Sequence, residues 1–182
     1  MLASDAEAAA VKYKVPKVAL PFYVYQDGGE LPYYASGYMG NYQVMSVDLN
    51  NTEEVYAGET AIKIHYAAEA NWYGLAFVDP ANDWGEILGG YNISEAKTFS
   101  FWAKSGDFAV KATIGFGLID DNKPFPDTDK KAIEVELTSE WQKFTIKTKK
   151  LDLSCIRSGL VIFSSGNGFD AHDIYIDEVV FE

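Results

Sequence analysis

Nucleophilic or acid–base catalysis would have few residues to draw on in this sequence. It contains two histidines, His65 and His172, and one cysteine, Cys155. Neither histidine lies in a nucleophile-elbow or metal-helix motif, so both are expected to be surface residues. Cys155 has no companion motif and is expected to be a small buried apolar side chain. The sequence therefore predicts a protein that is not an enzyme. One enzymatic alternative stays open, a glycosidase-type pair of carboxylates, because 27 Asp and Glu residues always allow some pair.

Oxygen-bearing side chains in turns point to a different chemistry, the binding of a hard cation. Asp27 ends the first predicted strand, and Asp177 lies in the last one. Calcium takes about six to eight oxygen ligands from carboxylates, amides and backbone carbonyls. Because the first and last strands of an antiparallel sandwich often adjoin, Asp27 and Asp177 are expected to share a calcium ion. The alternative is a polar loop that is simply rich in acidic residues.

Aromatic side chains are the third group that could do chemistry, with 11 Phe, 12 Tyr and 4 Trp. Rings in phase with strands, such as Phe99 and Phe144, are expected in the core. Others fall in loops rich in Gly, Asn and Pro, at 33–42 and 72–91, and loops lie at the surface. An exposed flat ring can stack on the C–H face of a pyranose while nearby polar groups bind the hydroxyls. The candidate ligand-binding residues are Tyr38, Asn71, Trp72, Asn82, Asp83, Trp84 and Tyr91.

Strands are the elements that must position these residues. Ile62, Ile64 and Tyr66 alternate with Lys63 and His65, which is the period of a half-buried strand. Similar runs, separated by Gly- and Asp-rich turns, predict strands at 22–26, 43–48, 62–66, 73–78, 97–104, 110–118, 133–137, 141–148, 159–164 and 172–181. The expected fold is all-β, an antiparallel two-sheet sandwich of the jelly-roll type. Residues 1–20 are interpreted as a linker or N-terminal arm, and residues 21–182 as the sandwich.

The last predicted strand changes phase within its length. Ile174 and Ile176 share one parity, whereas Val179 and Phe181 share the other. A β-bulge near Asp177 would let both pairs face the core, because a bulge inserts one extra residue into a strand. The alternative is a strand end that is buried on both faces.

Composition and charge exclude several classes of function. The net charge is -12, so a basic groove for nucleic acid is not expected. No run of 18 apolar residues exists, so membrane insertion is not expected either. A single cysteine excludes a disulfide framework. Residues 1–10 lack the basic and apolar regions of an intact signal peptide.

Several runs of residues together resemble carbohydrate-binding-module-like β-sandwich domains of the galactose-binding-like type. They are Tyr25-Gln26-Asp27, Ser36-Gly37-Tyr38-Met39-Gly40, Trp72-Tyr73-Gly74, Pro80-Ala81-Asn82-Asp83-Trp84-Gly85, Gly89-Gly90-Tyr91-Asn92-Ile93, Phe99-Ser100-Phe101-Trp102-Ala103-Lys104, Glu140-Trp141-Gln142-Lys143-Phe144 and Ile174-Tyr175-Ile176-Asp177-Glu178-Val179. The resemblance runs from about residue 22 to the end of the chain and implies a jelly roll, a secreted or cell-surface setting and a structural calcium near Asp27 and Asp177. The chain departs from the pattern at two places. It has Phe77-Val78 where the resemblance implies an aromatic residue and an amide, and Val161-Ile162-Phe163 where it implies another Trp.

These observations lead to one functional prediction and one rival. The prediction is a non-catalytic module that binds a neutral polysaccharide or oligosaccharide by aromatic stacking on a calcium-stabilised sandwich. The rival is a structural or assembly domain of a secreted or cell-surface complex, in which the loop aromatics would pack against a protein partner.

Overall fold

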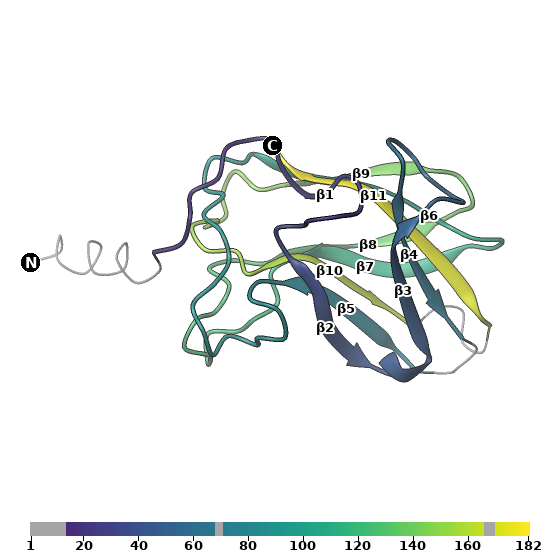
Figure 1. The fold of residues 1–182 in the computed structure, drawn as a ribbon, viewed down its shortest axis with the longest axis horizontal. Helices are drawn as coiled ribbons and strands as arrows, with labels where there is room; N and C mark the ends of the chain where they lie inside the picture. The colour runs from purple at the N-terminus through teal and green to yellow at the C-terminus, as the bar shows by residue number, and fades with distance from the viewer. Residues whose placement is uncertain (1–13, 68–70, 166–169) are drawn as a thin grey trace, which may run out of the picture.

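The computed structural model describes residues 14–67, 71–165 and 170–182, and in these the strands form two stacked antiparallel sheets (Figure 1). One sheet has six strands, in the order β3-β4-β11-β6-β9 with β1 paired to β11, and the other has five, in the order β2-β5-β10-β7-β8. The six-stranded sheet contains β1 (Phe22–Tyr25), β3 (Met45–Asn51), β4 (Ala61–Tyr66), β6 (Thr98–Ser105), β9 (Gln142–Lys147) and β11 (His172–Phe181). The five-stranded sheet contains β2 (Tyr34–Gly40), β5 (Tyr73–Val78), β7 (Val110–Phe116), β8 (Lys131–Leu137) and β10 (Ser158–Ser164). The predicted all-β, two-sheet class is confirmed.

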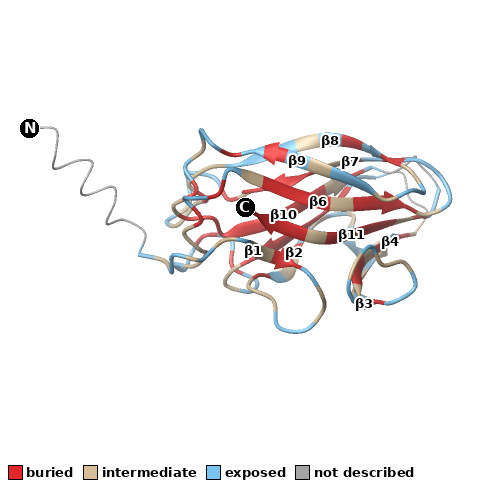
Figure 2. Cartoon of the chain, turned by 90° about the horizontal axis from the view of Figure 1, so that it is seen from above, coloured by how far each residue is buried: buried red, intermediate tan, exposed pale blue. Residues whose placement is uncertain are grey.

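Aromatic rings fill the space between the sheets. Phe99 and Phe181 of the six-stranded sheet meet Phe116 of the five-stranded sheet, with ring centroids 4.7–5.2 Å apart. All three are fully buried, and Figure 2 shows how buried residues dominate the central strands. Truncating one such ring to alanine typically costs about 3–5 kcal/mol of stability. The core therefore fixes how the two sheets face each other.

The predicted β-bulge lies where the last strand changes phase. The pairing of β11 with β6 shifts register between Asp177 and Val180, and Glu178 has a positive φ of 49°. Ile176 and Val179 consequently both enter the core although their parities differ. The bulge leaves Asp177 buried at the point where β11 bends.

One strand, β2, occupies a segment that the sequence predicted to be loop. Its glycines and tyrosines gave no apolar alternation, so backbone pairing with β5 decides its structure. Gly37 is required there, since a Cβ on it would come within 2.8 Å of the Ala76 Cβ. The same segment continues through a short 3₁₀ turn, Tyr42–Val44, into β3.

The described end of the N-terminal arm contacts the sandwich beside the loop that joins β5 to β6. The backbone N–H of Val18 donates to the Asn92 carbonyl, and the N–H of Asn92 donates to the Pro16 carbonyl. Val18 and Leu20 also pack against the core. Residues 16–20 are thus placed against the domain.

The outer faces of the two sheets differ in character. On the five-stranded sheet, Ala76, Val78 and Val161 form a second, smaller apolar cluster that Met39 and Phe163 cover in part. On the six-stranded sheet, the outward positions of β4 and β11 carry charged and aromatic side chains. This difference decides where each kind of ligand could bind.

Candidate functional site

A groove with a volume of about 740 Å³ crosses the outer face of the five-stranded sheet. Two aromatic side chains, Trp72 and Phe163, lie at the β5–β10 side of it. The rest of the lining comes from β7, β8 and the end of β10. It contains Ala112 and Val135 and the polar residues Lys111, Thr113, Glu134, Glu136, Ser164 and Ser165. Its volume falls in the range of about 300–1,000 Å³ that is common for ligand sites.

Trp72 is held in place although half of it is exposed. Its carbonyl accepts a hydrogen bond of 2.9 Å from the backbone N–H of Asn41. The indole lies directly over Gly40, where a Cβ would come within 2.9 Å of the ring and where φ is +63°. Because 51% of the residue's surface is exposed, the ring has one face on the protein and another available to a ligand.

Phe163 continues the apolar surface next to Trp72. The two ring centroids lie 6.4 Å apart with planes inclined by 46°. Gly74 makes room for the phenyl ring, since a Cβ there would come within 2.8 Å of Phe163 Cδ1. Small residues at the outward positions of β5 thus create a shallow floor on which two rings can lie.

The polar side of the groove consists of paired opposite charges and hydroxyls. In the pairing of β7 with β8, Lys111 is opposite Glu136 and Thr113 is opposite Glu134. Glu134 and Glu136 alternate along one strand, so their Cα atoms are about 7 Å apart and their side chains leave the same face of the sheet. A glycosidase places its two carboxyl groups on either side of the scissile bond. Glu134 and Glu136 instead lie on the same strand and on the same wall of the groove.

The predicted binding residues on the β2 side and at the β4–β5 loop do not all meet at this groove. Asn71 is exposed next to Trp72, and its carbonyl accepts a hydrogen bond of 2.7 Å from the Tyr66 hydroxyl. Tyr38 is in register with Leu75, which faces the core, so its side chain leaves the sheet on the side opposite Trp72. Its ring lies 6.1 Å from that of Tyr42.

The remaining predicted residues, 82–84 and Tyr91, lie at the other end of β5. Six strand residues separate them from Trp72, a span of about 20 Å. Asn82 is exposed and donates its backbone N–H to the Ser36 hydroxyl, and Trp84 is also exposed. Tyr91 packs between Phe22 and Tyr33 and donates its hydroxyl hydrogen to the Pro32 carbonyl. These residues therefore do not share a surface with Trp72.

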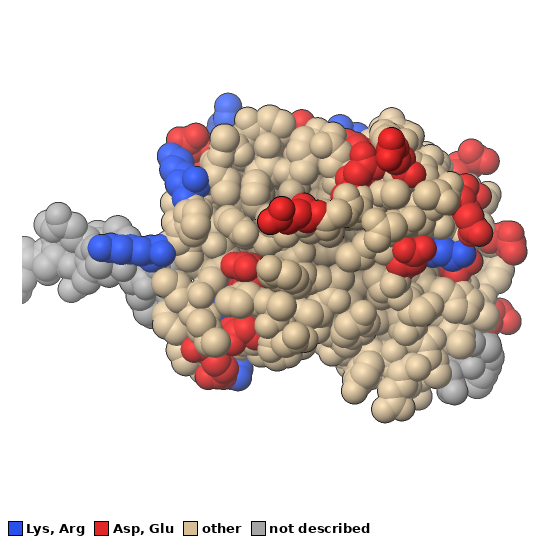
Figure 3. All heavy atoms as spheres, viewed as in Figure 1, with Lys and Arg blue, Asp and Glu red and all other residues tan. Residues whose placement is uncertain are grey.

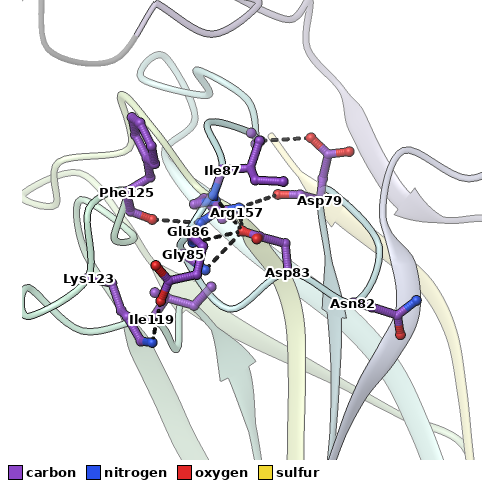
Figure 4. Close-up of polar contacts among 12 residues, drawn as sticks. Asp79, Asn82, Asp83, Gly85, Glu86, Ile87, Ile119, Lys123, Phe125 and Arg157 are labelled. Carbon is purple, nitrogen blue, oxygen red and sulfur yellow. Dashed lines mark hydrogen bonds and ion pairs between the residues drawn. The ribbon is translucent and has the colours of Figure 1, made fainter.

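Asp83 has a structural partner that the sequence did not reveal (Figure 4). Its Oδ1 accepts a 2.5 Å hydrogen bond from Nη2 of Arg157, which is completely buried, and further bonds from the backbone N–H groups of residues 85–87. Burial acts to raise the pKa of Asp83, but the hydrogen bonds and the charge of Arg157 outweigh it and lower that pKa. Figure 4 shows the Asn82 side chain pointing away from this cluster. Asp83 holds its loop on Arg157, which immediately precedes β10, and its carboxylate is not presented to solvent.

Asp27 and Asp177 lie close together at the bulge, together with Glu178. Asp177 Oδ2 accepts hydrogen bonds of 2.9 and 3.1 Å from the N–H groups of Tyr56 and Ala57, and Asp27 Oδ1 accepts bonds of 2.8 and 2.9 Å from those of Glu59 and Thr60. Burial raises the pKa of Asp177, and the charge of Asp27 adds to the increase. Burial raises the pKa of Glu178, and the charges of Asp177 and Asp27 add to the increase.

Asp27, Asp177 and Glu178 bring three acidic side chains to one part of the domain. Carboxylate oxygens that repel one another are the ligands of a hard cation, and a bound ion would relieve the repulsion. No three or more His, Cys, Asp or Glu side chains within the described ranges group as a metal site. Asp27 and Asp177 would therefore hold an ion only with help from backbone carbonyls or water. Both carboxylates already accept backbone N–H groups, and two carboxylates alone fall short of the roughly six to eight oxygen ligands that calcium takes.

The sequence prediction missed the polar residues of the groove. Their positions along the strands indicate which way they face, but not which strands are neighbours. Lys111 and Thr113, and Glu134 and Glu136, occupy the polar parity of two strands that were predicted. Alternation shows that they face outward. It does not show that β7 pairs with β10 and that β8 lies beyond β7, which is what brings these residues near Phe163.

Comparisons with known proteins bear on the fold. No family model matches the sequence, and no curated protein matches it. The family 30 carbohydrate-binding module of a cellulosomal cellulase of Clostridium thermocellum is similar in structure, with a TM-score of 0.55 at 14% identity over 90% of this chain and 98% of that one. The family 11 module of another cellulosomal cellulase of that organism has a TM-score of 0.54 at 13% identity, over 91% and 95%. TmCBM61, solved in complex with β-1,4-galactotriose, has a TM-score of 0.51 at 17% identity, over 83% and 94%.

The chain thus has the β-sandwich fold of carbohydrate-binding modules, and the predicted resemblance is confirmed at the level of fold. In the part of the chain that is described, no helix is long and apolar enough to cross a membrane.

Proposed function

We propose that this chain is a non-catalytic carbohydrate-binding domain and that the groove beside Trp72 is its binding surface. The observation that carries the proposal is the half-exposed indole of Trp72, fixed over Gly40 and continued by Phe163. A rigid aromatic floor binds the C–H face of a pyranose at little conformational cost.

The polar wall would orient the sugar. Hydroxyl groups need both donors and acceptors, and Lys111, Thr113, Glu134 and Glu136 provide them within one groove. The net charge of -12 disfavours anionic polymers, so the proposed ligand is a neutral polysaccharide or oligosaccharide. Such a ligand agrees with a secreted or cell-surface location, which is part of the proposal.

Calcium bound at Asp27 and Asp177 belongs to the proposal as a structural ion. The clustered carboxylates and the raised pKa of Asp177 support it, because a cation would stabilise the charged forms that burial disfavours. The ion would hold the 56–60 loop against β11, and its role would be stability.

An assembly domain is the second candidate, and one observation favours it. Trp84, Ile87 and Leu88 are exposed on the loop that joins β5 to β6. Exposed apolar side chains that gather on one surface often mark a protein interface. Light scattering with the wild-type chain and Ile87→Asp would reveal a partner copy at this loop.

Isothermal titration against soluble glucans, xylans and mannans tests the proposed function. Saturable binding to at least one polymer, competed by its own hexasaccharide, is the expected result. A folded protein that binds none of the three classes would contradict carbohydrate binding.

A further inference from the structure

A second set of aromatic rings lies on the outer face of the opposite, six-stranded sheet, onto which Figure 2 looks. Tyr56 belongs to the loop between β3 and β4, Trp102 to β6, and Trp141 immediately precedes β9. Tyr56 stacks on Trp102 with centroids 3.8 Å apart and planes inclined by only 15°, and Trp141 meets Tyr56 edge-on at 5.9 Å. These three rings, the Tyr56 cluster, are separated from Trp72 by the whole thickness of the sandwich.

The rings of the Tyr56 cluster are not needed by the core. Phe101 and Ala103, the neighbours of Trp102 in β6, are buried between the sheets, so Trp102 points outward. Tyr56 covers one face of the Trp102 indole and is itself 41% exposed. The outer face of Tyr56 is therefore an open aromatic platform.

The platform is rigid because two buried polar side chains, Asp177 and Asn51, hold its loop. Asp177 accepts the backbone N–H groups of Tyr56 and Ala57, and Asn51 Nδ2 donates to the Glu54 carbonyl at 3.0 Å. A ring that is fixed before binding loses little conformational entropy when a ligand stacks on it.

The rim of the cluster carries side chains of both charges. Lys104 Nζ donates to Glu54 Oε2 at 2.7 Å, and Lys63 pairs with Glu53 at 3.3 Å. Lys143 is exposed and lies opposite Trp102 in the pairing of β6 with β9. Acidic side chains predominate on the face of the molecule seen in Figure 3, and the chain as a whole carries -12. A rim that offers both hydrogen-bond donors and acceptors is complementary to a polyhydroxylated ligand.

We propose that the Tyr56 cluster is a second saccharide-binding site, in which a pyranose stacks on Tyr56 beside Trp141 while Lys143 and Glu54 bind its hydroxyls. The inference rests on the proposed function of the domain, because the same class of ligand would bind at both sites. Two sites on opposite faces cannot be filled by one straight sugar chain. The domain would then bridge two polysaccharide chains, and on an insoluble matrix both sites would add to its avidity.

The four tryptophan indole N–H signals in a proton–nitrogen NMR spectrum distinguish the sites, once each is assigned by a single Trp→Phe variant. Titration with cellohexaose, xylohexaose and mannohexaose is expected to shift Trp102 and Trp141 together, in the wild type and equally in Trp72→Ala. Tyr56→Ala is expected to weaken that response about tenfold or more and to leave the Trp72 response unchanged. Tyr42→Ala, which removes an exposed ring outside both sites, is the matched control.

The outcomes separate this inference from the proposed function. A response of Trp72 without one of Trp102 and Trp141 overturns the second site and leaves the groove intact. A response of Trp102 and Trp141 without one of Trp72 supports the second site and contradicts the groove. Shifts of Trp102 and Trp141 that follow protein concentration in the absence of sugar would identify an interface between copies and overturn the inference, as would no response at any indole.

Discussion

The Asp83 carboxylate and the Arg157 guanidinium form a buried ion pair with 2.5 Å between Oδ1 and Nη2, and their residues lie 74 positions apart in the sequence. Arg157 also donates to the carbonyls of Asp79 and Phe125. One side chain thus ties together the loops that follow β5 and β7. The hydrogen bonds of Arg157 therefore fix the relative positions of these two loops at one end of the sandwich.

Asp83→Asn is expected to lower the free energy of unfolding by about 3 kcal/mol, because it leaves the Arg157 charge buried without its partner. Urea denaturation would measure the loss. Glu86→Gln, an acid-to-amide change in the same loop, removes only an exposed pair with Lys123 and should cost less than about 1 kcal/mol. Equal losses in the two variants would argue against a structural role for Asp83.

His172 makes stability depend on pH. Burial lowers the pKa of His172 below 6.5, and its Nε2 lies 2.9 Å from the Tyr73 hydroxyl. Because the unfolded chain takes up this proton first, stability should fall as the pH drops from 6.5 through the lowered pKa. His172→Gln should reduce the pH dependence of the melting temperature between about pH 7 and 5. An identical profile in both proteins would refute the assignment.

Calcium, if bound only by the folded chain, should raise the melting temperature by mass action. Excess chelator is expected to lower the transition of the wild type and to leave that of Asp177→Asn unchanged. Asp173→Asn, on the same strand but partly exposed, should respond to the chelator as the wild type does. If chelator leaves the melting temperature of the wild type unchanged, the proposal of a structural calcium ion is wrong.

Gly40 is expected to control the groove without touching a ligand. Gly40→Ala places a Cβ against the Trp72 ring at a φ of +63°, so it should destabilise the fold by about 1 kcal/mol and weaken binding. Gly106→Ala is the matched control, since the nearest atom to its Cβ would be 3.6 Å away. Titration and melting of both variants provide the comparison, and unchanged binding in Gly40→Ala would contradict the placement of Trp72.

Local sequence patterns predicted the parts of the fold that depend on which neighbouring side chains face the core. Alternation located β4 and β8, and the phase change of β11 predicted its bulge, because both follow from which side chains face the core. β2 was missed, since its conformation depends on pairing with β5 and its own residues show no alternation.

The same distinction applies to the candidate site: residues with a local signature could be predicted, and those that depend on distant partners could not. Trp72 could be singled out as a ring in a polar loop, which is a local property. Asp83 has that same local appearance, but its partner Arg157 is 74 residues away, so the sequence could not distinguish a ligand-binding acid from a structural one. Phe163 could not be singled out, because the residues of both parities in its strand, Val161, Ile162 and Phe163, are apolar.

The affinity of Trp72→Ala for the polysaccharide that the wild type binds best tests the central claim most directly. A central Trp typically contributes about 2 kcal/mol or more to binding, so the variant should bind at least about 30-fold more weakly with an unchanged melting temperature. Trp84→Ala, an equal truncation at the other end of β5, should retain wild-type affinity. Full binding by Trp72→Ala together with a loss in Trp84→Ala would contradict the account.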